Sequence, residues 1–330
     1  MKTSWILSAF LLMAAALLLG SCNKLADNSG FVGGPETANF NSGGQKAEED
    51  KDEKEDEGID WESIDIQPEV TSDSEVKVMS FNVRVVSGED AAAGNGWDSR
   101  KKGIPVMVKT INPTVIGVQE AQPTHMTYLK ANLTDYDCVG GGRDGGDKGE
   151  HTAIFYKRDE VQMIKNGTFW LSETPSQVSY GWGAQYRRIA TWAIFKKIAT
   201  GEFFFHMNTH LDFGEEVVTP EMNLIASKMQ EYNPNGYPGV FTGDMNTVQT
   251  SPVFNVIRTA GWKSARTEAR DTDNSITFHG YGSGGGVIDH VFFHKFTATK
   301  FKVVNEKYNG VRYLSDHYPV YAIVGFPVNQ

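Results

Sequence analysis

The sequence predicts one α/β domain over residues 66–330. The chain has 330 residues, of which 40% are hydrophobic and 12% aromatic, enough for a large core. Many strand-like segments alternate with a few helical ones, which favours a single layered domain over two small ones. Turn residues separate several neighbouring strands and indicate antiparallel pairing. No repeat of 20–50 residues is visible, which argues against a solenoid.

The expected strands are short runs rich in β-branched and aromatic residues. Residues 76–83 alternate between apolar and polar, and residues 115–120 form a buried run that ends in a carboxylate. The other predicted strands cover residues 152–156, 188–195, 203–210, 239–242, 287–293 and 319–324.

The expected helices carry apolar residues three or four positions apart. The longest lies between the strands at 203–210 and 239–242 and has Met222, Ile225 and Met229 on one face. The other predicted helices span residues 97–111, 123–133 and 251–260.

The N-terminus carries a targeting signal. Lys2 precedes an apolar run over residues 5–19, which is short for a membrane span, and small residues follow. The ending Leu-Gly-Ser-Cys22 resembles a bacterial lipobox, which implies a signal peptide over residues 1–21 and a lipid on the Cys22 thiol. We therefore expect a lipid-anchored protein of the bacterial cell envelope, on the outer membrane or the cell surface. Cys138 then has no partner, so no disulfide is expected.

Residues 22–65 form a predicted acidic, flexible tether that lacks apolar periodicity. Residues 48–65 contain eleven acidic and two basic residues, a net charge of −9, and residues 1–47 have a net charge of +1. Because the whole chain carries −10, only −2 belongs to residues 66–330. We interpret the acidic run as a solvated linker rather than a calcium site. The nearly neutral domain lacks the basic stripe that grips duplex nucleic acid.

Polar residues end one predicted strand after another. Strand ends on a common rim converge in three dimensions, so these side chains are expected to meet. Carboxylates suit Mg²⁺, and an imidazole beside a carboxylate suits acid–base or charge-stabilising chemistry near neutral pH. In residues 240–246, the same Gly, Asp and Asn also suit an ordinary strand-to-turn exit. The set comprises Asn82, Glu120, His210, Asp244, Asn246, Asp289, Asp316 and His317.

Six short segments occur together in one order along the chain. They are Met79-Ser-Phe-Asn82, Gly117-Val-Gln-Glu120, Asn208-Thr-His210, Thr242-Gly-Asp-Met-Asn246, Ile288-Asp289 and Leu314-Ser-Asp-His317. Over about residues 76–326 this pattern resembles the endonuclease/exonuclease/phosphatase superfamily, the deoxyribonuclease-I-like group of Mg²⁺-dependent phosphohydrolases. The resemblance implies a four-layer αββα sandwich, in which two mainly antiparallel sheets pack face to face with helices outside.

The resemblance also implies roles at the metal and the attacking water. Glu120 is expected to be the principal ligand of Mg²⁺, for which Mn²⁺ is an alternative. Asn82 is expected beside the metal and the scissile phosphate, and Asp316 is a candidate for a second metal position. Asp244 is expected to orient or deprotonate water, and Asn246 to hold phosphate or help that alignment.

Further roles concern the charge that develops on phosphate. The resemblance implies that His317 stabilises this charge and that Asp289 orients His317. His210 is expected on the opposite lip, paired with Glu150, which begins a strand similar to one of the family. Arg188 resembles an arginine that contacts phosphate.

Two segments are expected to shape the substrate site. Arg143, in the glycine-rich segment 140–145, is a candidate for the rim or for substrate binding. That segment lacks the strand–loop–helix context of a nucleotide P-loop. The aromatic residues over 170–186 either stack a base or a sugar or pack into the fold.

The expected function is a divalent-metal-dependent phosphohydrolase that works by in-line attack of an activated water. The family's frequent activity favours a nuclease or another phosphodiesterase. The near-neutral domain favours a phosphatase or phosphodiesterase for a small head group, such as an inositol phosphate, a sphingomyelin-like lipid or a sugar phosphate. A surface-binding lipoprotein on a retired hydrolase fold would lack Glu120, Asp244 or His317, and all three are present. The chain is expected to act as a monomer.

Overall fold

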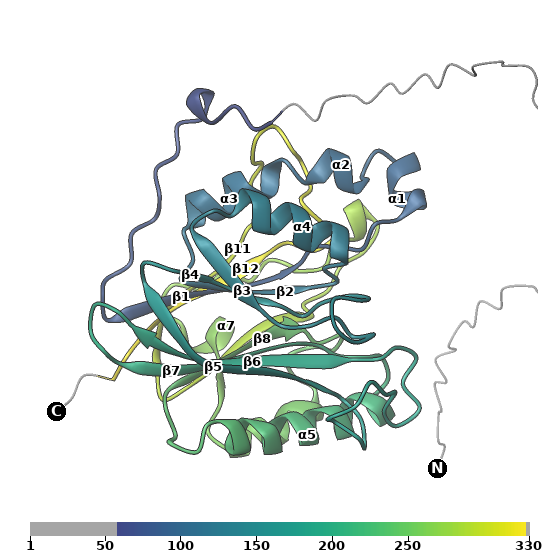
Figure 1. Cartoon of the computed structure of the whole chain (residues 1–330), viewed down its shortest axis with the longest axis vertical. Helices are drawn as coiled ribbons and strands as arrows, with labels where there is room; N and C mark the ends of the chain where they lie inside the picture. The colour runs from purple at the N-terminus through teal and green to yellow at the C-terminus, as the bar shows by residue number, and fades with distance from the viewer. Residues whose placement is uncertain (1–57, 328–330) are drawn as a thin grey trace, which may run out of the picture. The chain divides into compact units, whose positions relative to one another are not determined.

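The computed structural model describes residues 58–327; the predicted signal peptide, Cys22 and most of the predicted tether lie outside this range. Over the described residues, the strands form two six-stranded sheets that pack face to face between outer helices (Figure 1). This arrangement confirms the predicted four-layer sandwich. No helix within 58–327 combines the length and apolar character needed to cross a membrane.

The first sheet has the strand order β11–β12–β1–β2–β4–β3. Its neighbours run antiparallel, except for β1 and β2, which are parallel. The strands are β1 (Glu75–Asn82), β2 (Val115–Gln119), β3 (Tyr136–Val139), β4 (Ile154–Lys157), β11 (Thr297–Val303) and β12 (Val320–Gly325).

The second sheet has the order β5–β6–β7–β8–β10–β9, and its parallel pair is β7 with β8. Parallel neighbours end at the same edge of a sheet, so each sheet brings the C-terminal ends of two strands together. The strands are β5 (Val161–Trp170), β6 (Ile189–Lys197), β7 (Phe203–His210), β8 (Gly239–Asp244), β9 (Lys263–Ser264) and β10 (Asp289–His294).

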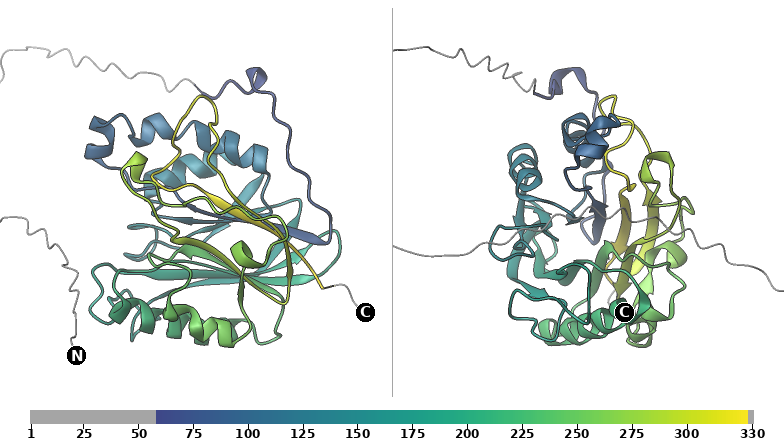
Figure 2. Two further views of the ribbon diagram at one scale, coloured as in Figure 1. Left: turned by 180° about the vertical axis from the view of Figure 1, so that it is seen from behind. Right: turned by 90° about the vertical axis from the view of Figure 1, so that its right-hand side faces the viewer.

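The helices flank the two sheets (Figures 1 and 2). The first sheet is covered by α1 (Gly88–Ala92), α2 (Trp97–Arg100), α3 (Gly103–Ile111) and α4 (Pro123–Asn132). On the other side α5 (Glu215–Tyr232) lies along the second sheet, and the shorter α6 (Asn255–Thr259) and α7 (Ala265–Glu268) follow it in the chain. Single 3₁₀ turns occur at Trp61–Ser63, Pro252–Phe254 and Gly280–Gly282.

The helix predicted over residues 97–111 is two helices, α2 and α3. A turn at residues 101–102 separates them. At Gly103, which begins α3, an added Cβ would lie 2.5 Å from Leu314 Cδ2. The chain therefore approaches the 308–314 segment closely at the break, which requires glycine there.

Three apolar clusters separate the four layers. One lies between the first sheet and its helices and includes Phe81 and Met107. The cluster between the sheets includes Phe204 and Val240, and the one beneath α5 includes Phe241. Every residue of β2 and β8 is buried, which explains why these strands show no alternation of apolar and polar residues.

Residues 58–65, predicted to end the tether, lie against the domain. Ile59, Trp61 and Ile64 pack on the cluster beneath the outer helices. Lys109 Nζ lies 4.1 Å from the centre of the Trp61 ring. The packed domain therefore begins upstream of the predicted boundary at residue 66, because apolar residues alternate with the last acidic ones of the run.

Candidate active site

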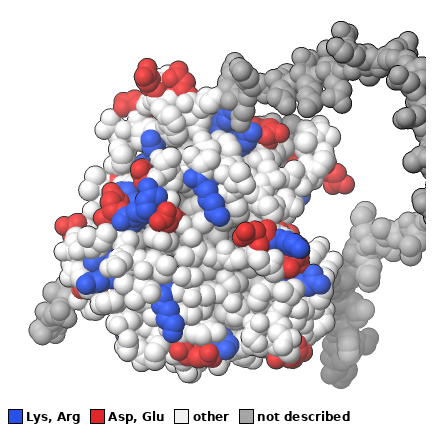
Figure 3. Space-filling view, viewed as in Figure 1, with Lys and Arg blue, Asp and Glu red and all other residues white. Residues whose placement is uncertain are grey.

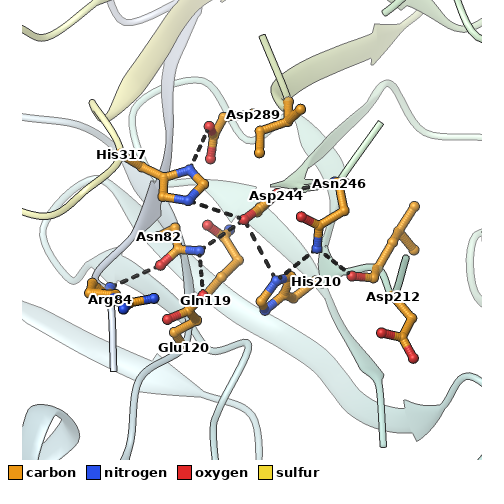
Figure 4. Close-up of polar contacts among 12 residues, drawn as sticks. Asn82, Arg84, Gln119, Glu120, His210, Asp212, Asp244, Asn246, Asp289 and His317 are labelled. Atoms are coloured by element: carbon orange, nitrogen blue, oxygen red, sulfur yellow. Dashed lines mark hydrogen bonds and ion pairs between the residues drawn. The ribbon is translucent and has the colours of Figure 1, made fainter. Parts of the chain in front are cut away.

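The register of the two parallel pairs explains why the predicted residues converge. In the first sheet Asn82 lies opposite Gln119, and Glu120 follows directly. In the second sheet His210 and Asp289 both lie opposite Asp244, on its two neighbouring strands. The strand ends of both sheets thus meet at one edge of the sandwich (Figure 4).

Three residues just after the strands of the site have strained backbone conformations. Arg84, Glu120 and Asn246 have φ angles of 57°, 59° and 47°, in the left-handed region that residues other than glycine rarely adopt. Each follows a strand of the site within two residues. Such conformations persist where the surrounding contacts fix them, and they are typical of functional sites.

Asn82 links the carboxylates of the two sheets. Its Nδ2 donates to Glu120 Oε1 at 3.0 Å and to Asp244 Oδ2 at 2.9 Å. Its Oδ1 accepts from the Arg84 amide at 2.9 Å, and Glu120 Oε2 accepts from the Val85 amide at 2.8 Å. The strained turn after β1 therefore orients both Asn82 and Glu120.

Asp244 lies at the centre of the site and is 1% exposed. Its Oδ1 accepts from the Asn246 amide at 3.1 Å. Its Oδ2 lies 3.6 Å from Nε2 of His317 and 3.6 Å from Nε2 of His210. Burial raises the pKa of Asp244 to about 7, against the opposing effect of His317. A carboxylate with this pKa suits proton transfer near neutral pH.

His317 lies on one lip of the site, and its predicted contact with Asp289 is present. Nδ1 of His317 lies 2.9 Å from Oδ2 of Asp289. Burial alone would lower the pKa of His317, but Asp289 and Asp244 outweigh it and raise the pKa to about 10. At neutral pH this side chain is therefore a buried cation held between two carboxylates.

His210 lies on the other lip, where its partner is a cation. Arg188 Nη1 lies 2.8 Å from Nδ1 of His210. A guanidinium can only donate, so Nδ1 accepts and Nε2 carries the hydrogen. Burial and the charge of Arg188 hold the pKa of His210 well below its usual value. His210 is thus neutral, and its Nε2 lies 3.2 Å from Asn246 Nδ2 and 3.6 Å from Asp244 Oδ2 (Figure 4).

The predicted pairing of His210 with Glu150 is wrong. Glu150 forms a bidentate ion pair with Arg143, at 2.7 Å and 2.8 Å. Arg188 occupies the position behind His210 that was predicted for Glu150. The sequence does not show which residue contacts Glu150, because Arg143 and Arg188 both lie in loops that could approach it.

Arg188, predicted to contact phosphate, has an almost fully buried side chain. Its side chain is 4% exposed, and its Nη2 lies 3.6 Å from Oδ1 of buried Asp212. Asp212 in turn accepts from the Tyr186 amide at 3.0 Å, and its own amide donates to Glu221 Oε2 at 3.0 Å. Sequence reasoning missed Asp212 and Glu221. The Asp two residues after His210 was the available signal for the first.

Asp316 faces the site beside an arginine that sequence reasoning missed. Its Oδ2 lies 3.5 Å from Arg84 Nη1, and its Oδ1 accepts from Ser315 Oγ at 3.2 Å. Arg84 also pairs with Asp90 at 2.8 Å. Since a guanidinium already neutralises Asp316, this carboxylate suits a second metal less well than predicted.

Behind these residues, a polar cluster joins the two sheets. Asn208 donates to the carbonyls of Val118 and Ala153 across the gap, at 2.8 Å and 3.1 Å. Its Oδ1 accepts from Gln119 Nε2 at 2.7 Å. A Cβ at Gly117 would lie 2.4 Å from Asn208 Oδ1, so glycine permits this close approach. The cluster holds the strand ends in register across the sandwich.

The site opens into a cavity of about 660 Å³. This volume lies within the usual range of roughly 300–1,000 Å³ for small-molecule sites. The lining residues that carry charge are Arg84, Glu120, Arg143, Glu150, Arg188, Asp244, Asp316 and His317, and the apolar ones include Tyr186, Phe213, Phe278 and Ile288.

The donor set fits a divalent cation. Glu120, His210 and Asp244 each offer a ligand atom within 4.8 Å of the others. His210 fits least, because its Nδ1 is engaged by Arg188 and its Nε2 carries hydrogen. Four carboxylates line the cavity, and hard divalent cations prefer such oxygen ligands. Glu120, with Asn82 beside it, is best placed to hold that cation.

Comparisons with known proteins agree with this geometry. The model of the endonuclease/exonuclease/phosphatase family matches residues 79–317. A mannosyl-6-phosphatase from Bacteroides thetaiotaomicron is 33% identical over 76% of this chain and 100% of its own, with a TM-score of 0.73. A family member from Bacteroides vulgatus is 33% identical over 77% of this chain and 99% of its own, with a TM-score of 0.72.

A more distant structure shares the fold. D. rerio TDP2, complexed with a single-stranded DNA product, is 19% identical over 76% of this chain and 99% of its own, with a TM-score of 0.61. A comparison with curated protein sequences gave no match.

Proposed function

The chain belongs to the endonuclease/exonuclease/phosphatase family, and we propose that it hydrolyses a phosphate ester of a small molecule with the help of a bound divalent cation. The observation that carries this proposal is the position of Asp244. It lies at the base of a 660 Å³ cavity, between a cationic and a neutral histidine. This arrangement suits attack by water on a bound phosphate.

Asp244 would take the proton from the attacking water, since its pKa of about 7 matches neutral pH. The Asn246 amide and Asn82 Nδ2 hold its carboxylate in place. The attack is in line with the leaving alcohol and needs no covalent intermediate.

His317 would stabilise the charge that develops on the phosphoryl oxygens. Its cationic form persists at neutral pH because Asp289 and Asp244 flank it. The Nε2 hydrogen of His210 approaches the same region from the opposite lip. Donors fixed in advance and aimed at developing charge contribute strongly to such reactions.

Glu120 would hold the cation, Mg²⁺ or alternatively Mn²⁺, beside the phosphate, and Asn82 Nδ2 would keep the Glu120 carboxylate in position. The cation supplies positive charge to the phosphate oxygens when it is bound. Glu120 lines the cavity and accepts from Asn82 Nδ2 and the Val85 amide, and its negative charge there supports this assignment.

Three observations favour a small substrate over a polynucleotide. A relative that is 33% identical is a mannosyl-6-phosphatase. Residues 66–330 are nearly neutral in net charge. On the face shown in Figure 3, basic and acidic side chains are interspersed among uncharged surface without a continuous basic stripe. A nuclease, the first expectation from the sequence, thus becomes the second candidate.

The test is phosphate release from a panel of esters by the purified protein and its Asp244→Ala variant, with Mg²⁺, Mn²⁺ or EDTA. The panel contains sugar phosphates, inositol phosphates, bis-nitrophenyl phosphate, sphingomyelin and single-stranded RNA and DNA. We expect activity on small phosphate esters that is lost with EDTA and falls about 10²–10⁴-fold in the variant. Activity that survives both treatments contradicts the mechanism, and activity on polynucleotides alone contradicts the substrate class.

We also propose that the protein is anchored through a lipid on Cys22, on the basis of Leu-Gly-Ser-Cys22 and the apolar run before it. Labelling of cells with a fatty-acid analogue should mark the wild-type protein and not a Cys22→Ala variant. Equal labelling of both proteins would contradict the anchor.

A further inference from the structure

Two exposed aromatic rings form one wall of the cavity. Tyr186 is 38% exposed and Phe213 is 51% exposed, and both line the cavity. Their ring centroids lie 6.5 Å apart in an edge-to-face arrangement. Large apolar rings exposed on a concave wall are typical of a surface that binds a ligand.

This wall is rigid. The Tyr186 amide donates to buried Asp212 at 3.0 Å. The guanidinium carbons of Arg143 and Arg188 lie 5.3 Å and 5.0 Å from the centre of the Tyr186 ring. A ligand therefore meets a preformed surface, and little ordering accompanies binding.

Beside the rings lies a fixed pair of hydrogen-bonding groups. The bidentate pair of Arg143 and Glu150 is only 17% and 16% exposed, and Trp170 Nε1 donates to the Arg143 carbonyl at 2.8 Å. The pair presents N–H donors and carboxylate acceptors side by side. Hydroxyl groups on neighbouring carbons both donate and accept, so they match such a pair.

The ion pairs around the cavity favour a substrate with a single phosphate group. Each arginine that lines the cavity, among residues 58–327, already has a carboxylate partner, so little positive charge remains for a second phosphate. The pairs are Arg84–Asp90 at 2.8 Å, Arg143–Glu150 at 2.7 Å and Arg188–Asp212 at 3.6 Å. This argues against inositol polyphosphates.

The same arginines argue against a quaternary ammonium head group. Such a cation binds over the faces of aromatic rings. Arg143 and Arg188 lie over Tyr186, and Arg188 also lies 5.8 Å from the Phe213 ring centre. A phosphocholine group would meet these cations rather than a free aromatic cage.

We propose that Tyr186, Phe213 and the Arg143–Glu150 pair form a binding subsite for a sugar ring that carries a single phosphate. The exposed Phe213 ring would meet the C–H face of the sugar, with Tyr186 edge-to-face behind it, and the ion pair would meet the neighbouring hydroxyls. The subsite rests on the proposed function, because the phosphate must reach Asp244 for the sugar to lie here. The subsite would make the enzyme specific for the alcohol part of the phosphate ester.

The test compares KM and kcat for hexose 6-phosphates, phosphocholine and methyl phosphate, which lacks a sugar. We expect Phe213→Ala to raise KM for the preferred hexose 6-phosphate about tenfold, with a much smaller change for methyl phosphate. Glu150→Gln should also raise KM for the hexose 6-phosphate more than KM for methyl phosphate. Tyr180→Ala is the matched control, because Tyr180 is 53% exposed on the same segment but does not line the cavity.

A binding measurement separates recognition from turnover. Titration of mannose 6-phosphate into Asp244→Ala should show binding that the added Phe213→Ala substitution weakens by a similar factor. Equal effects of Phe213→Ala on methyl phosphate and hexose 6-phosphates would overturn the subsite, as would a wild-type preference for phosphocholine or methyl phosphate. Absence of phosphate release from every ester by the wild type would instead overturn the proposed function.

Discussion

His317 and His210 lie on opposite lips of one site, and their Nε2 atoms are each 3.6 Å from the same oxygen of Asp244. Both are buried, yet one is a cation and the other is neutral. The difference comes from the residue behind Nδ1, which is Asp289 for His317 and Arg188 for His210. Burial favours the neutral form of both rings; at His317 it is outweighed by Asp289 and Asp244, whereas at His210 Arg188 adds to it, so the partner behind each ring accounts for the difference in charge.

The sharpest test removes each ring in turn. His317→Ala should lower kcat about 10³-fold at pH 7, because it removes a buried cation aimed at the phosphate. His210→Ala should cost about tenfold, as expected for loss of a neutral donor. Steady-state kinetics with one phosphate ester would measure both. Equal losses of kcat in the two variants would show that the difference in charge between the histidines does not affect catalysis.

The next test removes the carboxylate behind His317. In Asp289→Asn, burial is no longer opposed by Asp289, so the pKa of His317 should fall from about 10. We expect a loss of about 10²-fold in kcat at pH 8 and a smaller loss at pH 6, where the cation is partly restored. A pH profile from 5 to 10 gives the result. An unchanged profile on the alkaline side would contradict the role of Asp289.

A smaller effect is expected behind His210. In Arg188→Met, the pKa of His210 should rise but remain below its usual value, since burial persists. The tautomer is then no longer fixed, and kcat should fall about tenfold. Nitrogen-15 NMR of the imidazole reports both tautomer and pKa. Arg188→Lys is the control, because it keeps the positive charge; an identical His210 spectrum in Arg188→Met would refute the assignment.

The smallest effect on activity is expected at Glu221, behind Asp212. Burial raises the pKa of Glu221 to about 8. The folded state thus retains a proton that the unfolded state releases above about pH 4.5. Stability should therefore fall as the pH rises from about 4.5 to 8.

Glu221→Gln should remove this dependence and stabilise the protein at pH 8.5 by on the order of 2 kcal/mol, with kcat little changed. Denaturant unfolding at pH 5.5 and 8.5 measures this difference. Parallel pH dependence in the variant and the wild type would exclude Glu221 as its source.

The sequence predicted those parts of the molecule that depend on local pattern. The apolar strands with terminal polar residues, such as residues 115–120, and the long helix α5 were visible in their spacing. Strand β5 was not, because it is an edge strand whose outer residues are exposed and polar. The residues of the central site were also recognisable, since each lies at or near one end of a predictable strand.

The residues that contact this central site were harder to predict from the sequence. Arg143, Arg188 and Glu150 lie in loops whose relative positions depend on the packed fold, so the sequence alone allowed either arginine to pair with Glu150. Arg84 and Asp212 each lie two residues after a predicted site residue. Their importance follows from turn geometry that no periodic pattern records.

The pairing of β1 with β12 has a consequence for synthesis. β1 ends at Asn82, whereas His317 lies just before β12, the last strand in chain order among the described residues. The edge of β1 that receives β12 stays unpaired until the late part of the chain is made. The site is therefore complete only after residue 317 has been synthesised, and a nascent chain that ends before it lacks both His317 and the strand that pairs with β1.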